Sequence, residues 1–176
     1  MSSSTVILGL GSNMGDRMGF LTRAVQSLSK HVLKDMMVSP IYASDAEVPE
    51  GADTSYHQPF YNIAVAGKTD KAAFDVLKSI RELEAQIGFH DHTRKWAPRE
   101  IDIDILAYGD QIIEDKTLVV PHPQLMKRPF ALLPLLDVAP EWRHPLTKET
   151  AASVATQWKR AGVPFATTKT REVIVL

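Results

Sequence analysis

The most constraining feature of the sequence is the alternation of isoleucine and aspartate over residues 101–105. Side chains alternate across a β-strand, so residues two positions apart share a face. Ile101, Ile103 and Ile105 then face a core, while Asp102 and Asp104 share the other face. The alternation therefore predicts a half-buried strand, which we place over residues 101–108.

Hydrophobic periodicity predicts the other elements around this strand. Further strands are expected over residues 6–10, 36–42, 60–66, 111–113 and 171–176, and helices over 21–32, 74–87 and 130–138. Asp70 is expected to cap the second helix and Gly88 to end it, and Pro134 should shorten or kink the third. The order strand, helix, strand, strand, helix, strand predicts an α+β ferredoxin-like sandwich. Its antiparallel sheet carries packed helices and extra C-terminal elements.

Length and composition limit the classes of protein. The 176 residues fit a single domain, with residues 146–176 as a C-terminal extension. There is no cysteine, which excludes disulfides and thiolate metal sites and favours a cytoplasmic location. The net charge of −1 gives no support for a nucleic-acid partner, and no apolar run is long enough for a membrane span. The sequence leaves open a monomer or a homodimer.

The paired carboxylates are the strongest candidate for chemistry. Asp102 and Asp104 lie about 7 Å apart along an extended strand and can converge on one or two hard cations. Magnesium binds few protein carboxylates and completes its shell with water and substrate phosphates. The pair therefore suits Mg²⁺ carrying a nucleotide, although two solvated acids on a half-exposed strand are an equally good interpretation of the pair alone.

Residues near the pair favour a phosphate ligand. Arg99 offers a planar fork for phosphate oxygens, and Trp96 a flat face for a heterocycle. The alternatives are a surface salt bridge for Arg99 and a core anchor for Trp96. Further along, His122 lies between two prolines and can hydrogen-bond a phosphate or make a structural hydrogen bond. The glycine-rich stretch over residues 9–16 lacks the P-loop lysine and is interpreted as a tight turn from strand to helix.

Several motifs together resemble the 6-hydroxymethyl-7,8-dihydropterin pyrophosphokinase family. They are Leu8-Gly9-Leu10-Gly11-Ser12-Asn13, Phe60-Tyr61-Asn62, Trp96-Ala97-Pro98-Arg99 with Asp102 and Asp104, and Pro121-His122-Pro123 with Arg128 and Phe130. The resemblance is strongest over residues 6–145. It implies a ferredoxin-like domain that transfers diphosphate from ATP to the hydroxymethyl group of the pterin, releasing AMP, in folate biosynthesis.

The resemblance also implies roles for individual residues. Asp102 and Asp104 would hold two Mg²⁺ ions with ATP, and Arg99 and His122 would act with them as catalytic residues. The remaining assignments are ATP binding for Glu84, Trp96, Arg99, Ile105, His122 and Arg128, and pterin binding for Ser44, Phe60, Asn62, Trp96 and Phe130.

The sequence departs from the family pattern in two loops. Phe89 stands where the family usually has an arginine, and Arg94 or Lys95 is expected to substitute for it. The Tyr-x-Thr-x-Pro pattern is replaced by Tyr42-Ala43-Ser44-Asp45-Ala46, and the span to Asn62 is longer than expected. Two alternatives stay open: a divergent paralogue with a different acceptor, and a non-catalytic module that binds nucleotide or pterin.

Overall fold

The computed structural model describes residues 2–45, 50–51, 59–88 and 98–176. Its centre is a six-stranded antiparallel sheet with the order β5-β1-β4-β3-β8, in which β2 also pairs with β4. The strands are β1 (Ser4–Ser12), β2 (Lys34–Val38), β3 (Tyr42–Ser44), β4 (Phe60–Thr69), β5 (Asp102–Tyr108) and β8 (Thr167–Lys169). A separate hairpin pairs β6 (Ile113–Glu114) with β7 (Val119–Val120).

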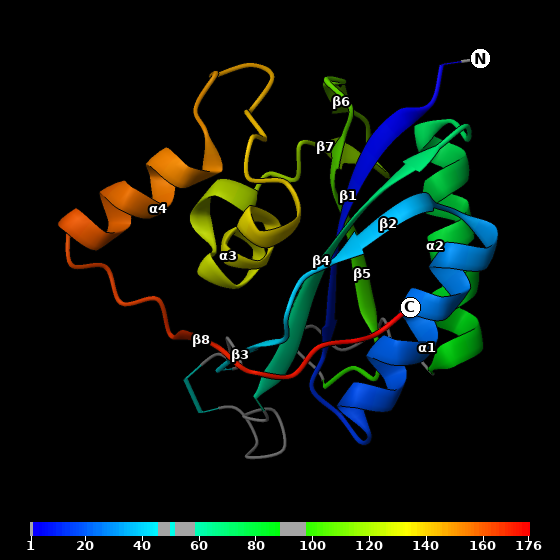
Figure 1. Cartoon of the computed structure of the whole chain (residues 1–176), viewed down its shortest axis with the longest axis horizontal. Helices are drawn as coiled ribbons and strands as arrows, with labels where there is room; N and C mark the ends of the chain where they lie inside the picture. The colour runs from blue at the N-terminus through cyan, green and yellow to red at the C-terminus, as the bar shows by residue number, and fades with distance from the viewer. Residues whose placement is uncertain (1, 46–49, 52–58, 89–97) are drawn as a thin grey trace.

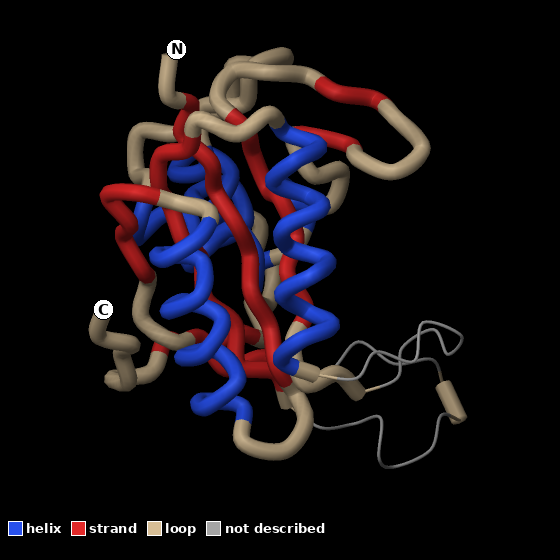
Figure 2. The backbone as a smooth tube through the Cα atoms, turned by 90° about the vertical axis from the view of Figure 1, so that its right-hand side faces the viewer, coloured by secondary structure: helices blue, strands red, loops and turns tan. Residues whose placement is uncertain are grey.

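Helices cover both faces of the sheet. Two long helices, α1 (Arg17–His31) and α2 (Ala73–Ile87), lie side by side on one face (Figure 2). On the other face a 3-10 turn, η2 (Leu125–Lys127), leads into α3 (Pro129–Val138), and α4 (Ala151–Arg160) packs on α3 (Figure 1). None of the helices in the described part of the chain has the length and apolar character to cross a bilayer.

Two apolar clusters correspond to the two faces of the sheet. Alternate residues of β1 separate between them, with Val6, Leu8 and Leu10 under α1 and α2, and Ile7 under α3. The same alternation places Ile103 and Ile105 of β5 in the first cluster. The predicted α+β ferredoxin-like fold, with its antiparallel sheet and packed helices, is confirmed.

Three details of the predicted elements are wrong. The strand expected over residues 36–42 is two strands, because Ser39 and Pro40 leave the ladder and the Ser39 hydroxyl accepts a hydrogen bond from the Ala64 N–H at 2.9 Å. Ala72 rather than Asp70 is the N-cap residue of α2, which has no side-chain cap, and the Asp70 carboxylate pairs instead with Lys34 Nζ at 2.8 Å. The expected strand over 171–176 is irregular, and β8 precedes it.

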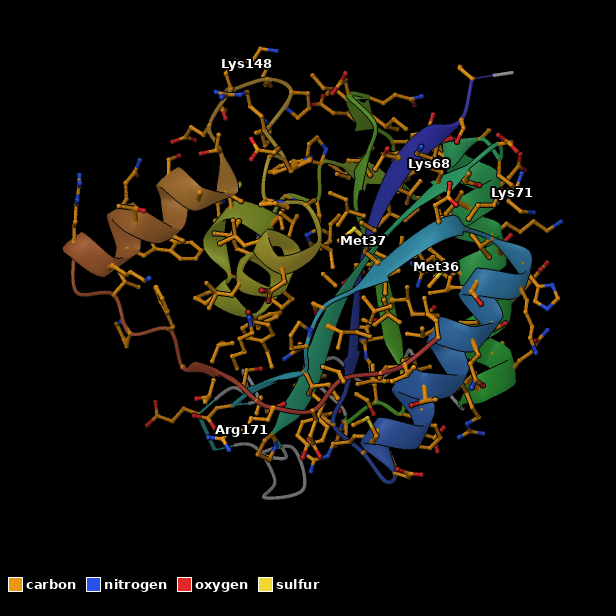
Figure 3. The ribbon with its side chains drawn as sticks, viewed as in Figure 1. Met36, Met37, Lys68, Lys71, Lys148 and Arg171 are labelled. Carbon is orange, nitrogen blue, oxygen red and sulfur yellow. The ribbon has the colours of Figure 1, made fainter. Side chains whose placement is uncertain are left out.

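The outer strand β2 is short and irregular. Its pairing with β4 shifts between Lys34 and Met37, and Asp35 has a φ of 50°. The two methionines of β2, labelled in Figure 3, differ in environment: Met36 packs on the core, whereas Met37 is 55% exposed. A bulged edge of this kind is a poor template for pairing with another chain.

Candidate active site

A cavity of about 340 Å³ opens on the face of the sheet that α3 covers only in part. Under α3 this face carries Ile7, Ala64 and Leu106. Two residues further along their strands, at the uncovered end, the same face carries Gly9, Asn62 and Asp104, which line the cavity. Beyond α3 the covered apolar face thus becomes an open polar face.

Two glycines of β1 form the floor between the polar groups of the cavity. In the sheet register Gly11 lies opposite Asp102 on one side and Asn62 on the other, and Gly9 lies opposite Asp104. A Cβ at position 11 would come within 3.1 Å of Asn62 Oδ1 and 3.3 Å of Phe60 Cδ1. The predicted turn from strand to helix is confined to residues 13–16, because β1 continues through both glycines to Ser12 and α1 begins at Arg17.

The position of Arg99 is fixed by Asn13 at the end of β1. The Asn13 side-chain Oδ1 accepts a hydrogen bond from the Arg99 N–H at 2.7 Å, and the Asn13 N–H donates to the Arg99 carbonyl at 3.1 Å. Held in this way, the Arg99 guanidinium lies 3.1 Å from Asp102 Oδ1. Asn13 was not among the predicted site residues, although it belongs to the motif that ends β1.

The carboxylate of Asp104 lies in an unfavourable environment for a negative charge. It is exposed to the cavity, but the surrounding protein desolvates it, and Asp102 and Glu84 add negative charge. Together these effects raise the pKa of Asp104 from 3.8 to about 7. A cation at the pair would relieve both penalties, and no cluster of three or more His, Asp or Glu side chains offers another metal site among the described residues.

Glu84 lies behind the carboxylate pair and does not line the cavity. Its side chain is buried and accepts a hydrogen bond from the Ile103 N–H at 2.8 Å, while its other oxygen pairs with Arg81 at 3.1 Å. Because Ile103 stands between Asp102 and Asp104, Glu84 fixes the backbone between the two carboxylates. The ATP-binding role of Glu84 stays a prediction.

His122 lies beside the cavity rather than among its lining residues. Its N–H donates to the Leu106 carbonyl at 2.9 Å, and its Nδ1 accepts from the Gln124 N–H at 3.2 Å. Burial and the positive charge of Arg128 lower the pKa of His122. The ring is therefore neutral at pH 7, with its proton on Nε2.

The remaining described site residues come from the start of α3 and from β3 and β4. Arg128 and Phe130 lie at the start of α3, with the Arg128 guanidinium carbon 5.6 Å from the Phe130 ring centroid. On β3 and β4 the Asn62 amide donates to the Ser44 hydroxyl at 2.7 Å, and Phe60 lies opposite Ser44 in the sheet register. The amide Nδ2 is thereby engaged, so Asn62 presents its oxygen.

Several predicted site residues do not line the cavity or fall outside the description. Ile105 is buried in β5 and does not line the cavity. Because Ile103 directs its N–H to the outer edge of β5, Ile105, two residues on, presents its backbone to that same edge. Trp96, Arg94 and Lys95, together with the departure at Phe89, lie outside the described residues.

Comparison with known proteins identifies the family. Residues 7–140 match the family described as 7,8-dihydro-6-hydroxymethylpterin-pyrophosphokinase. The chain belongs to this family. The family prediction is confirmed, and with it the prediction of an ATP-dependent diphosphotransferase of folate biosynthesis.

Two curated relatives of this family cover most of the chain. The 2-amino-4-hydroxy-6-hydroxymethyldihydropteridine pyrophosphokinase of Aquifex aeolicus is 39% identical over 83% of this chain and 87% of its own length. The Bacillus subtilis protein of the same name is 35% identical over 87% of this chain and 89% of its own length.

Solved structures agree on the fold. Wild-type HPPK-DHPS of Plasmodium falciparum superposes with a TM-score of 0.69 at 16% identity, over 96% of this chain. This chain spans 48% of that protein's length. At this level of identity the likeness concerns the fold alone.

Proposed function

We propose that the cavity binds ATP with two Mg²⁺ ions at its carboxylate end and 6-hydroxymethyl-7,8-dihydropterin at its amide end. The observation that carries this assignment is that one cavity joins Asp102, Asp104, Arg99 and Arg128 to Asn62, Ser44, Phe60 and Phe130. Asn62 and Asp102 flank Gly11, so the two ends lie about 10 Å apart, two strand spacings. A diphosphate fits within that distance.

In the reaction the hydroxymethyl oxygen bonds to the β-phosphorus of ATP, and the bond from that phosphorus to the oxygen bridging the α- and β-phosphates breaks. AMP leaves, and the hydroxyl proton is lost to solvent or to a phosphate oxygen. When bound, the two Mg²⁺ ions supply charge neutralisation at the transferring phosphate. Asp102 and Asp104 are the residues that would hold them.

The cationic side chains orient the phosphates. Asn13 fixes the backbone of Arg99, and the ion pair with Asp102 at 3.1 Å holds its guanidinium at the carboxylate end. Neutral His122 offers Nε2–H as a hydrogen-bond donor, and Arg128 adds a second positive charge at the start of α3. No covalent intermediate on the protein is needed.

The amide end selects the acceptor. Asn62 presents its oxygen because Ser44 holds its nitrogen, and Phe60 and Phe130 provide aromatic walls for a flat heterocycle. The altered loop after Ser44 motivates a second candidate, a related acceptor with the same diphosphate chemistry. The cytoplasmic location, a single domain over residues 1–176 and the choice between monomer and homodimer stay predictions.

The first experiment measures AMP and pterin diphosphate after incubation with Mg-ATP and hydroxymethyl-dihydropterin. We expect pterin-dependent AMP, lowered about 100-fold or more in the Asp102→Ala variant because the transition state loses a metal ligand. Asp110→Ala, which removes an exposed carboxylate of the following turn, is the matched control and should retain full activity. A wild-type protein that releases no pterin-dependent AMP at high concentration would overturn the proposal.

A further inference from the structure

The last ten residues return to the sheet beside the amide end of the cavity. They follow the family-matched residues 7–140, and β8 pairs with β3 so that Lys169 lies opposite Tyr42 and Thr167 opposite Ser44 (Figure 1). Beyond β8, the Thr170 N–H donates to the Ile41 carbonyl at 2.8 Å, and the Ile41 N–H donates to the Glu172 carbonyl at 3.0 Å. Ile174 then packs into the core at 8% exposure.

One polar network joins this segment to two elements of the cavity. Lys169 Nζ lies 2.7 Å from Asp137 Oδ1 and 5.8 Å from the centroid of the Tyr42 ring. The other carboxylate oxygen of Asp137 accepts a hydrogen bond from the Tyr42 hydroxyl. Three segments far apart in the sequence, β3, α3 and β8, therefore meet at a single carboxylate.

The position of Asp137 needs such partners. It lies in the last turn of α3, where the helix dipole disfavours a negative charge and where α3 has no basic residue of its own. Lys169 supplies the missing positive charge from β8. Burial and the hydrogen bond to Asp137 raise the pKa of Tyr42, so its hydroxyl remains a donor throughout the physiological range.

Both elements joined by Asp137 also carry residues of the cavity. β3 presents Ser44, whose hydroxyl fixes the Asn62 amide, and the first turn of α3 carries Phe130 at the cavity wall. The distance between β3 and α3 therefore sets the width of the amide end of the cavity, where the proposed flat acceptor would lie. The start of α3 also carries Arg128, whereas β3 carries only the acceptor-side Ser44 among the lining residues, so a contact that fixes β3 against α3 should act more on acceptor binding than on ATP.

We propose that Lys169 is a positioning residue for the acceptor: through Asp137 and Tyr42 it sets the spacing of β3 and α3, and so the C-terminal segment is part of the pterin end. The identity of the ligand rests on the proposed function. The claim that the C-terminal segment shapes one end of the cavity and not the other rests on geometry alone.

The test compares steady-state kinetics of the wild type with the Lys169→Met variant, which keeps the aliphatic stem and removes the charge. We expect KM for the pterin to rise roughly two- to tenfold, with KM for ATP and kcat within twofold of the wild type. The Lys169→Arg variant should restore the wild-type KM. Lys159→Met, which removes an exposed lysine of α4 in the same C-terminal extension, is the matched control and should change nothing.

Several outcomes would overturn the inference. One is an active Lys169→Met enzyme with unchanged pterin KM; another is an equal rise in the KM values of both substrates. If the Lys169→Met variant does not fold, the Tyr42→Phe variant removes only the hydroxyl of the same network. It must then raise the pterin KM selectively. A wild type without pterin-dependent AMP would instead contradict the proposed function, so the two failures are distinguishable.

Discussion

At the scale of single residues, the site depends on two positions that have no side chain. Gly9 and Gly11 lie in the middle of the sheet, between the carboxylate pair and Asn62. A strand interior disfavours glycine, since it loses conformational entropy and packs nothing. Their presence in β1 is explained by the close approach of Asn62 and Phe60 above Gly11 and of the Leu106 side chain above Gly9.

Replacing Gly11 with alanine tests this explanation. The new Cβ would press on Asn62 Oδ1 and the Phe60 ring, so we expect KM for the pterin to rise about tenfold, as for a loss of about 1.4 kcal/mol in binding. The proposed ATP site lies at the other end of the cavity, so KM for ATP should change less than KM for the pterin. Steady-state kinetics with each substrate varied in turn measures both KM values. An unchanged KM for the pterin would contradict the explanation that Gly11 leaves space for Asn62 and Phe60.

The sequence predicts the strand that pairs Asp102 with Asp104 better than the glycine floor beside it. Asp102 and Asp104 follow from a period of two within one strand, which needs no tertiary information. The sequence over residues 9–16 is interpreted as a turn, although glycine is common both in turns and where another chain segment approaches closely. Only the cross-strand register, which depends on strands distant in the sequence, separates the two roles.

At the scale of elements, β5 is positioned by a helix as well as by its neighbouring strand. It pairs with β1 on one side, and on its outer edge the Ile103 N–H is bound by Glu84 of α2. Local patterns predicted both β5 and α2, yet a contact across 19 residues depends on how the helix packs. The same holds for the hydrogen bond between Tyr42 and Asp137, which spans 95 residues.

The Glu84→Ala variant measures how much the hydrogen bond from the Ile103 N–H to Glu84 contributes to stability and activity. It leaves the buried Ile103 N–H without its acceptor, so we expect the free energy of unfolding to fall by about 1–3 kcal/mol. Activity at saturating Mg-ATP should fall as well, because the backbone between the two carboxylates loses its anchor. Chemical denaturation and an AMP assay give the two values. Glu82→Ala, an exposed carboxylate two positions earlier on α2, serves as the control, and equal effects of both variants would exclude a specific role.

At the scale of the whole molecule, the ionised carboxylate of Asp104 lowers the free energy of unfolding. The folded state raises the pKa of Asp104 above its ordinary value of 3.8. The folded protein therefore binds this proton more tightly than the unfolded chain does. It follows that ionisation of Asp104 destabilises the fold, and that the penalty develops as the pH rises from about 4 to about 7.

The Asp104→Asn variant should remove that penalty. In the absence of divalent cations we expect it to be more stable than the wild type at pH 8, by about 1 kcal/mol after allowing for solvent in the cavity. At pH 4 the difference should vanish, since Asp104 is then protonated in the folded wild type. Denaturant titrations in EDTA at the two pH values check this, and a difference that does not depend on pH would count against the assigned cause. Activity should be lost in the same variant.

The glycine floor has a consequence for how proteins of this design can diversify. Every single-base change that replaces Gly9 or Gly11 by another amino acid adds at least a Cβ at the bottom of the cavity. The shape of the cavity at these two positions therefore cannot change gradually. New acceptor preferences must then arise at lining positions that already carry a side chain, such as Ser44 and Asp45. A saturation library over the cavity should accordingly recover glycine alone at the floor and many residues at those lining positions.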